Sequence, residues 1–283
     1  MALDNIITLE DADSPDSHLY RRYGTSHQAK TAEWNTTLEA ILSHRSVRTY
    51  LPRPVPESVL QLAIAAAQSA PTSSSLQAWS VVAIEDPQRR AKLAELASPN
   101  PQILSAPLFL VWLADLSRLR NIATERGKTG EGLDYLESFL LGTIDAALAA
   151  QNALTALESL GLGTCYIGGI RNHPAEVGEA LGLPSEVFAV FGMTVGYPDP
   201  AIETEVKPRL PQSLVLHREQ YGAASPQTDL ADYDETMRTF QTGQRMAVRG
   251  WTNVVANRIA DAAALKGRHV LLDVVRHMGF KVK

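Results

Sequence analysis

A long apolar helix in the middle of the chain constrains the fold more than any other segment. The spacing of its apolar residues predicts a helix over residues 133–160, ended by Gly161. At 1.5 Å per residue such a helix is about 40 Å long, the length of a small domain. Its apolar stripe consists of Leu136, Leu140, Ile144, Ala147, Leu154 and Leu157. We expect this helix to be central, and a subunit interface is one place where its stripe could be buried.

Four short apolar segments around this helix have the length and composition of strands. The predicted strands are residues 81–84, 108–114, 164–168 and 187–195. Shorter helices are predicted from Thr36 or Thr37 through Leu42, and over residues 59–67, 87–97 and 174–182. Residues 117–131 are interpreted as a polar excursion. Strands separated by helices, with helices at both ends, favour an α+β fold layered around one sheet.

The two ends of the chain differ from this middle part. Residues 1–33 carry many acidic side chains and no sustained apolar period, so we expect a peripheral extension that is frayed or loosely docked. Residues 34–209 hold the predicted strands and form the predicted core. Residues 210–283 are expected to form a helical arm, with helices over 233–240, 251–265 and 270–278.

Composition excludes several classes of protein. Hydrophobic residues make up 45% and charged residues 20%, which excludes disorder throughout, collagen and a disulfide scaffold. With 26 Lys and Arg against 31 Asp and Glu, the formal net charge of −5 has the wrong sign for a nucleic-acid binder. Residues 205–283 alone carry 12 Lys and Arg against 8 Asp and Glu. This part either contacts an anion or presents solvated helix faces.

Neither a membrane nor export is indicated. No run approaches the roughly 18 consecutive apolar residues of a membrane span. The start, Met1-Ala2-Leu3-Asp4, lacks the basic and apolar segments of a secretory signal. The single cysteine, Cys165, cannot close an intramolecular disulfide or build a Cys-based zinc site, and we expect no metal site. These features predict a cytoplasmic protein.

Common nucleotide and hydrolase signatures fail. Gly161-x-Gly163 begins like a dinucleotide fingerprint, but Tyr166 stands where the third glycine is needed. Gly127-Lys128-Thr129 ends like a phosphate loop whose first glycine is replaced by Ile122. The sequence has no Gly-x-Ser-x-Gly elbow and no His-Glu-x-x-His zinc helix. Hydrolase, nucleotidase and metalloprotease functions therefore lose their usual support.

Several short polar segments could bind phosphate or a heterocycle. His44-Arg45-Ser46-Val47-Arg48 offers two guanidinium groups, which suit phosphate because each donates two parallel hydrogen bonds, although a solvated turn remains an alternative. Thr72-Ser73-Ser74 and Gln77 offer hydroxyls and an amide, or else form a helix-capping loop. Lys207-Pro208-Arg209 places two cations on a proline kink.

Two further features have an equally open interpretation. Gly168-Gly169 lets a backbone approach a flat ligand because no Cβ intervenes, or it simply forms a turn. Glu137 and Asp145 lie in the long apolar helix. Since buried carboxylates need partners, each is either a salt-bridging core residue or a site residue.

Taken in order, six segments of this sequence resemble the FMN-dependent nitroreductase family. They are His44-Arg45-Ser46-Val47-Arg48, Pro71-Thr72-Ser73-Ser74-Ser75-Leu76-Gln77, Gln151-Asn152-Ala153-Leu154, Glu158-Ser159-Leu160-Gly161-Leu162-Gly163, Tyr166-Ile167-Gly168-Gly169 and Lys207-Pro208-Arg209. The sequence is most similar to the NADPH-preferring branch, which holds the oxygen-insensitive major nitroreductases and the flavin reductases that feed bacterial luciferase. The resemblance runs from about Thr37 to Arg209 with order and spacing kept, and continues more faintly into the C-terminal helices.

The resemblance implies a fold and an assembly. The expected fold is an α+β three-layer sandwich with a central, mostly antiparallel sheet flanked by helices. Two subunits are expected to intertwine as a homodimer, with residues 210–283 packed on the partner subunit. FMN would then lie at the dimer interface, with both chains lining each site.

The resemblance also implies which residues bind FMN. The phosphoribityl end would be held by His44, Arg45, Ser46, Lys207 and Arg209, and the ring and ribityl by Thr72, Ser73, Ser74, Gln77, Asn100, Glu137, Tyr166, Ile167, Gly168 and Gly169. Arg48 would lie near N1 of the ring, where a cation stabilises the negative charge that reduction leaves. Asn100 stands where the family has a glutamine. Arg245 and Arg249 are candidates for the 2′-phosphate of NADPH.

The implied function is that of an FMN-dependent NADPH oxidoreductase, a flavin reductase or nitroreductase, which reduces nitroaromatics, quinones or free flavin by ping-pong hydride transfer. NADH is a possible donor, and the partners are a small-molecule acceptor and a second copy of the chain. No acid–base triad is demanded, in agreement with the sequence. Two alternatives stay open: a substrate-specific flavin reductase or dehalogenase of the same fold, and a non-catalytic flavin-binding protein.

Overall fold

The chain forms two compact units in the computed structural model, which describes residues 14–24, 33–222 and 227–283. Unit 1 comprises Met1–Arg45 and Glu203–Ala264, and unit 2 comprises Ser46–Ile202 and Leu265–Lys283. Each unit therefore joins segments that lie far apart in the sequence.

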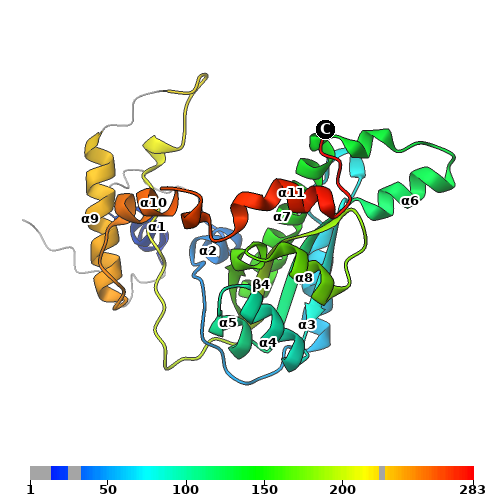
Figure 1. Ribbon diagram of the computed structural model, residues 1–283. Coiled ribbons are helices and arrows are strands. Elements are labelled where there is room, and N and C mark those ends of the chain that lie inside the picture. Colours follow the sequence, from blue (N-terminus) through cyan, green and yellow to red (C-terminus); the bar gives the residue numbers. More distant parts are fainter. Residues whose placement is uncertain (1–13, 25–32, 223–226) are drawn as a thin grey trace, which may run out of the picture. The chain divides into compact units, whose positions relative to one another are not determined.

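A four-stranded sheet forms the centre of unit 2 (Figure 1). Its strand order is β1-β2-β4-β3, and all three pairings are antiparallel. The strands are β1 Trp79–Ile84, β2 Leu108–Asp115, β3 Gly163–Ile167 and β4 Val187–Gly196. The four predicted strands are confirmed, with ends that shift by one or two residues. A mostly antiparallel sheet was expected, and the described strands form one.

Helices cover both faces of this sheet and make unit 2 a three-layer sandwich. They are α3 Glu57–Gln68, α4 Pro87–Leu96, α5 Pro101–Ser105, α6 Ser117–Glu125, α7 Leu136–Ser159, α8 Pro174–Leu181 and α11 Leu271–His277, with 3-10 turns at Ser73–Ser75, Glu131–Asp134, Gly168–Arg171 and Arg268–Val270. Successive side chains of β2 point to opposite faces. Leu108, Leu110 and Trp112 pack with α3 and α7, whereas the residues between them pack with α4, α5 and α8.

The long predicted helix is confirmed as α7. It ends before Gly161, whose φ of +81° favours glycine. Its fully buried Ala149, Ala150 and Ala153 allow close packing on α3 and the sheet. Among the described helices it is the one long and apolar enough to cross a membrane by length and composition. Its packed alanine face is that of a helix in the protein core.

Unit 1 is helical in its described residues. Its elements are α1 Pro15–Tyr23, α2 Thr36–Leu42, α9 Gln227–Gly243 and α10 Trp251–Arg258, with 3-10 turns at Gln212–Leu214 and Ala263–Leu265, the last of which reaches into unit 2. The frayed or loosely docked start expected from the sequence is wrong for residues 15–23, which form α1. This helix has Ser14 as its N-cap and buries His18, Leu19 and Arg22. Because two of these are polar, no apolar period reveals the buried face.

Two other expectations need correction. The polar excursion at residues 117–131 contains α6, whose Arg120 points inward to ion pairs instead of presenting an apolar face. The helix predicted over 251–265 ends as α10 at Arg258. After it, the Asp261 carboxylate accepts a hydrogen bond from the Ala264 N–H at 2.8 Å, a local turn that competes with the helix.

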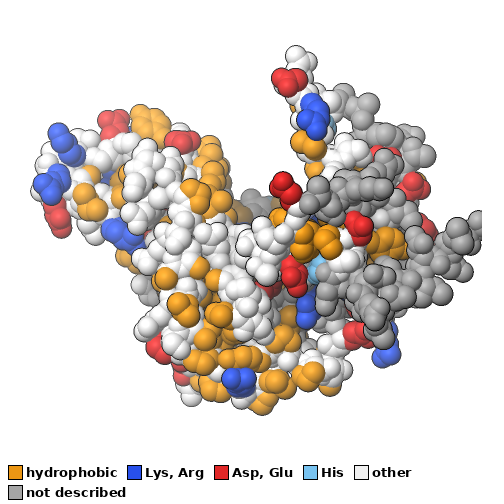
Figure 2. Space-filling model, turned by 180° about the vertical axis from the view of Figure 1, so that it is seen from behind, with side chains coloured by type: hydrophobic (Ala, Val, Ile, Leu, Met, Phe, Trp, Pro, Cys, Tyr) orange, Lys and Arg blue, Asp and Glu red, His pale blue; other side chains and the backbone are white. Residues whose placement is uncertain are grey.

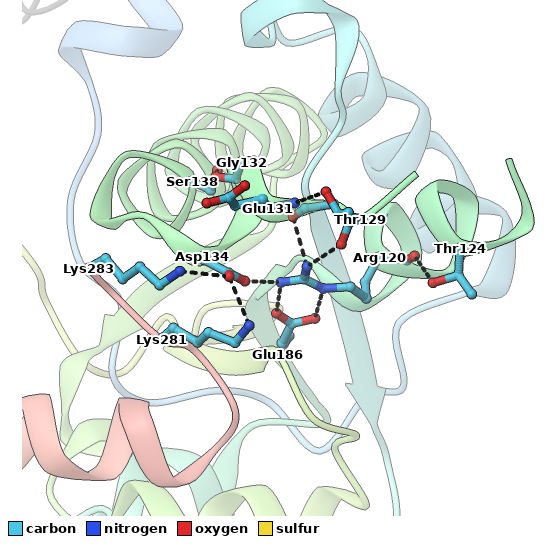
Figure 3. A network of polar contacts seen from close by, with 11 residues as sticks. Arg120, Thr124, Thr129, Glu131, Gly132, Asp134, Ser138, Glu186, Lys281 and Lys283 are labelled. Atoms are coloured by element: carbon cyan, nitrogen blue, oxygen red, sulfur yellow. Dashed lines mark hydrogen bonds and ion pairs between the residues drawn. The ribbon is translucent and has the colours of Figure 1, made fainter. Parts of the chain in front are cut away.

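An ion cluster ties the end of the chain to the turn before α7 (Figure 3). The Asp134 carboxylate lies 2.8 Å from Lys281 Nζ, 3.2 Å from Lys283 Nζ and 2.8 Å from Arg120 Nη2. Arg120 in turn makes a two-point contact with Glu186, at 2.6 and 3.0 Å. The C-terminal strap, residues 281–283, is thereby held against the rest of unit 2.

Candidate functional site

The segment Ser46–Arg48 lies along the outer edge of β3. Ser46 forms a parallel bridge with Thr164, and the Val47 N–H donates to the Thr164 carbonyl at 2.9 Å. A Cβ on Gly163 would lie 2.6 Å from the Val47 side chain, so only glycine permits this approach. The exposed Arg48 donates from Nη1 to the Ser46 carbonyl at 3.2 Å. Ser46 and Arg48 are thus fixed beside the sheet.

The hydroxyl-rich loop, residues 72–77, is anchored on Asp145 of α7. The buried Asp145 carboxylate accepts a hydrogen bond from Thr72 Oγ1 at 2.6 Å and another from the Ala78 N–H at 2.9 Å. Thr72 Oγ1 also accepts from the Gln77 N–H at 2.9 Å. Among the described residues Asp145 forms no ion pair, and the groups that bind it are the neutral donors that hold the loop. Because it is also buried, it is not exposed to a ligand.

This hydroxyl-rich loop has an unfavourable backbone. Ser74, Ser75 and Gln77 have φ values of +49°, +55° and +49°, in the left-handed region that favours glycine. Each such residue costs on the order of 1 kcal/mol and persists only where surrounding contacts enforce it. Here the contacts to Asp145 enforce it. The exposed side chains of Ser73, Ser74 and Gln77 are presented on the surface as a result.

The turn after β3 uses its two glycines differently. A Cβ on Gly169 would lie 2.5 Å from the Ala97 carbonyl, so its close approach is made to the protein's own backbone. A Cβ on Gly168 would find its nearest atom, from Arg171, at 3.6 Å, which is ordinary contact. Of the two predicted roles, the structure favours a turn for Gly169, which belongs to the 3-10 turn Gly168–Arg171. Ile167, just before it, is buried in the core.

Tyr166 lies at the end of β3, 37% exposed, with its ring edge-on to Phe191. Its hydroxyl lies 3.5 Å from Gln151 Oε1. Burial, and secondarily the charge of Glu158, raise the pKa of the Tyr166 phenol above its usual range. The phenol therefore stays protonated at neutral pH.

Asn100 and Glu137 have contrasting surroundings. Asn100 is the N-cap residue before α5, and its buried Oδ1 has no hydrogen-bond partner among the described residues. An orphaned buried acceptor of this kind is uncommon and points to a missing donor. Glu137 lies exposed in the first turn of α7. The expectation that it is a buried carboxylate is wrong for the single chain.

In unit 1, the segment Lys207-Pro208-Arg209 is held by hydrogen bonds to its backbone carbonyls. The buried Tyr233 hydroxyl donates to the Pro208 carbonyl at 3.2 Å, and burial raises the pKa of Tyr233, so it stays protonated for this bond. Arg209 Nη1 donates to the carbonyls of Lys207 and Pro208 at 3.1 and 3.3 Å. The Arg209 side chain remains exposed.

A pocket of about 580 Å³ lies against this segment. It combines cations with aromatic and methionine side chains, and its lining includes Lys207, Arg209, Tyr233, Phe240, Arg249 and Trp251. Arg249, one of the two predicted NADPH residues, lines the pocket, whereas Arg245 does not. The rim residues are fixed because Gln241 Oε1 accepts from the N–H groups of Arg249 and Gly250.

The start of α10, at the rim of this pocket, is capped by Asp234. Its carboxylate accepts from the N–H groups of Trp251 and Thr252, at 2.6 and 2.8 Å, and from the Thr252 hydroxyl. Burial alone would raise the pKa of Asp234, but these hydrogen bonds and the nearby Arg238 outweigh it and lower the pKa. Sequence reasoning missed Asp234, Gln241 and Arg22, because each acts through contacts outside its own helix, from 8 to 185 positions away.

Comparison with known proteins gives one consistent result. Residues 41–197 match the model of the nitroreductase family, and residues 207–283 match that of the nitroreductase family C-terminal domain. The FMN reductase (NADPH) of Bacillus subtilis (strain 168) is 38% identical, covering 87% of this chain and 98% of that protein. The oxygen-insensitive NADPH nitroreductase of Salmonella typhimurium is 40% identical, covering 72% and 82%. The solved NADPH:FMN oxidoreductase of Vibrio harveyi, complexed with NAD+, superposes with a TM-score of 0.78 at 36% identity, covering 88% of this chain and 100% of that one.

Proposed function

Since the chain belongs to the nitroreductase family, we propose that it binds FMN and prefers NADPH. As a member of this family it is an NAD(P)H-dependent oxidoreductase of the FMN reductase and nitroreductase kind. Its acceptors would be flat oxidants: nitroaromatics, quinones or free flavin. The observation that carries the proposal is the hydroxyl-rich loop, which buried Asp145 holds in a strained backbone with its polar side chains outward. We place the protein in the cytoplasm.

Each unit, taken by itself, carries residues that suit one part of FMN. In unit 2, Ser73, Ser74 and Gln77 supply donors and acceptors for the ring edge and ribityl, and the orphaned Asn100 Oδ1 is an acceptor that lacks a donor. Residues 166–169, at the end of β3 and the start of the turn after it, would offer backbone N–H groups to the ring. In unit 1, His44, Arg45, Lys207 and Arg209 supply cations and donors suited to a phosphate.

The protein's part in the reaction is electrostatic. When bound, FMN supplies the hydride chemistry that connects the nicotinamide donor to the acceptor. Arg48, exposed and fixed beside β3, would place a positive charge where reduction leaves negative charge. Tyr166, protonated and partly exposed at the end of β3, would border the face of the flavin ring on which donor and acceptor bind in turn. No side chain has to transfer a proton.

We also infer that two copies of the chain associate. Leu136, Leu140, Ile144 and Leu148 follow one another at four-residue spacing along α7 and are 48, 46, 56 and 39% exposed. An apolar stripe of this length on a soluble protein marks an interaction surface. Exposed apolar side chains are also visible as orange areas in Figure 2. Glu137 lies next to Leu136 of this stripe and is exposed in the single chain. A second copy packed on the stripe would bury Glu137 as well.

The direct test is anaerobic mixing of the purified, FMN-saturated protein with NADPH and NADH at equal concentrations. We expect bleaching of the flavin absorbance, faster with NADPH, followed by turnover of a nitroaromatic, a quinone and free FMN. Failure to bind added FMN would contradict the proposal. Bound FMN that neither nucleotide reduces would indicate a non-catalytic flavin protein, and turnover of only one acceptor class a specialised reductase.

The role of Arg48 has its own test. Arg48→Ala should slow the reduction of bound FMN by roughly tenfold to a hundredfold, because one charge-stabilising contact is typically worth this much or more. Its affinity for FMN should change by less. Arg126→Ala, which removes an exposed cation from the end of α6, is the matched control. Unchanged reduction rates in Arg48→Ala would refute the electrostatic role.

A further inference from the structure

Arg22, in α1, connects two segments that carry the proposed phosphate-binding residues. Its side chain is only 6% exposed. The guanidinium donates from Nη2 to the His44 carbonyl at 2.5 Å, from Nε to the Leu42 carbonyl at 3.1 Å and from Nη1 to the Lys207 carbonyl at 3.0 Å. All of these groups belong to unit 1.

The attachment to the Lys207–Arg209 segment is made twice. Besides the side-chain bond to the Lys207 carbonyl, the Arg22 carbonyl accepts the Arg209 N–H at 2.8 Å. On the other side of this segment, Tyr233 binds the Pro208 carbonyl. The backbone of the segment is thus held from α1 and from α9.

The attachment to the His44 segment uses the end of α2. Leu42 is the last residue of that helix, and helix carbonyls at this position lack an intrahelical partner. A cation there is also favoured by the helix dipole. An arginine fork can meet carbonyls in several directions at once, which the single ammonium of a lysine cannot do.

The two joined segments are both basic. One carries His44 and Arg45, and the other carries Lys207 and Arg209. Charge repulsion opposes holding them together, and a bound dianion would relieve it. Since α1 lies before residue 41, where the family model begins, this device belongs to the N-terminal extension of the chain.

We propose that Arg22 is a positioning residue that holds the His44–Arg45 and Lys207–Arg209 segments at the separation required to bind the phosphate of FMN. This rests on the proposed function, because it takes these segments as the phosphate site. The N-terminal helix is then a working part of cofactor binding.

The test separates phosphate binding from flavin binding in general. Wild type, Arg22→Ala and Arg22→Lys are titrated with FMN and with riboflavin, which lacks the phosphate, by flavin fluorescence. Arg22→Ala should lower the preference for FMN over riboflavin by about tenfold, equivalent to about 1.4 kcal/mol. Riboflavin affinity should stay within about twofold. Arg22→Lys should resemble Arg22→Ala, because it keeps the charge and loses the fork.

Arg218→Ala, which removes an exposed cation before α9, is the matched control and should keep the wild-type preference. An equal loss for both flavins in Arg22→Ala would mean a purely structural role and overturn the proposal. Full retention of the preference in Arg22→Lys would also overturn it, since charge alone would then suffice. If Arg22→Ala fails to fold, the preference of Arg22→Lys for FMN over riboflavin still tests the proposal. Wild type that binds neither flavin would instead refute the proposed function.

Discussion

At the scale of single residues, Asp145 illustrates how a buried carboxylate shapes a surface. It is buried in α7, where the dielectric constant is low, and among the described residues it accepts two hydrogen bonds, both from neutral groups. Burying a charge is costly unless it is well hydrogen-bonded, so each of these donors matters. The result is a loop that keeps an unfavourable backbone.

Thr72→Val is expected to break this arrangement. It removes the hydroxyl that binds Asp145 and accepts the Gln77 N–H, leaving a buried charge with one partner fewer. We expect the free energy of unfolding in urea to fall by about 1–3 kcal/mol and FMN affinity to fall with it. Thr124→Val, which removes an exposed hydroxyl that donates to the Arg120 carbonyl within α6, is the control. Equal effects of the two substitutions would show that the Asp145 anchor contributes nothing.

At the scale of elements, α10 depends on a cap contributed by another helix. Asp234 of α9 satisfies the first N–H groups of α10, and Gln241 of the same helix fixes the two residues before it. Arg249 and Trp251, which line the pocket of unit 1, are therefore positioned by α9. The two helices form one structural unit around this pocket.

Asp234→Ala is expected to loosen α10 selectively. Loss of an N-cap costs about 0.5–2 kcal/mol, and here the Thr252 hydroxyl also loses its acceptor. Hydrogen exchange should accelerate in Trp251–Arg258 and leave the strands of unit 2 unchanged. Glu235→Ala, at the exposed neighbouring position, is the control. Unchanged exchange in α10 would contradict the capping role.

At the scale of the whole molecule, the ion cluster around Asp134 makes stability depend on pH. The hydrogen bond from Lys281, then those from Arg120 and Lys283, outweigh burial and hold the pKa of Asp134 well below its usual range. The pKa of an aspartate in an unfolded chain is about 3.9. A depressed folded pKa contributes stability that is present above this value and is lost as the pH falls below it.

We therefore expect the free energy of unfolding to decrease as the pH is lowered below about 4. Asp134→Asn should be less stable at neutral pH and should show a shallower decrease on acidification. Asp232→Asn, at an exposed position, should follow the wild-type curve. Parallel acid curves for wild type and Asp134→Asn would rule out the cluster as the source of the dependence.

The proposed association of two copies is a second property of the whole molecule. Ile144→Lys places a charge on the exposed stripe of α7 and should halve the mass measured by sedimentation. Ile122→Lys, at a similarly exposed isoleucine of α6, should leave the mass unchanged. A wild-type chain that sediments as a monomer would contradict the dimer outright.

The sequence by itself determined the elements whose signals are local. Apolar runs located the four strands, helical spacing located α7, and Gly161 marked its end, because these depend on neighbouring residues only. The family segments, kept in order, identified the residues proposed for the cofactor. What they could not show is how those residues are held. Thr72 and Asp145 are 73 positions apart, and Arg22 and Lys207 are 185 apart.

Only the tertiary structure decided the roles of such residues, because hydrogen bonds between distant segments leave no periodic trace in the sequence. Helix α1 is packed through the polar residues His18 and Arg22. The spacing of apolar residues therefore cannot distinguish its buried face from an exposed one. The carboxylates of Glu137 and Asp145 lie on the same helix, yet one is exposed and the other is buried with two donors. Local spacing placed both on α7, and the packing around the helix separated them.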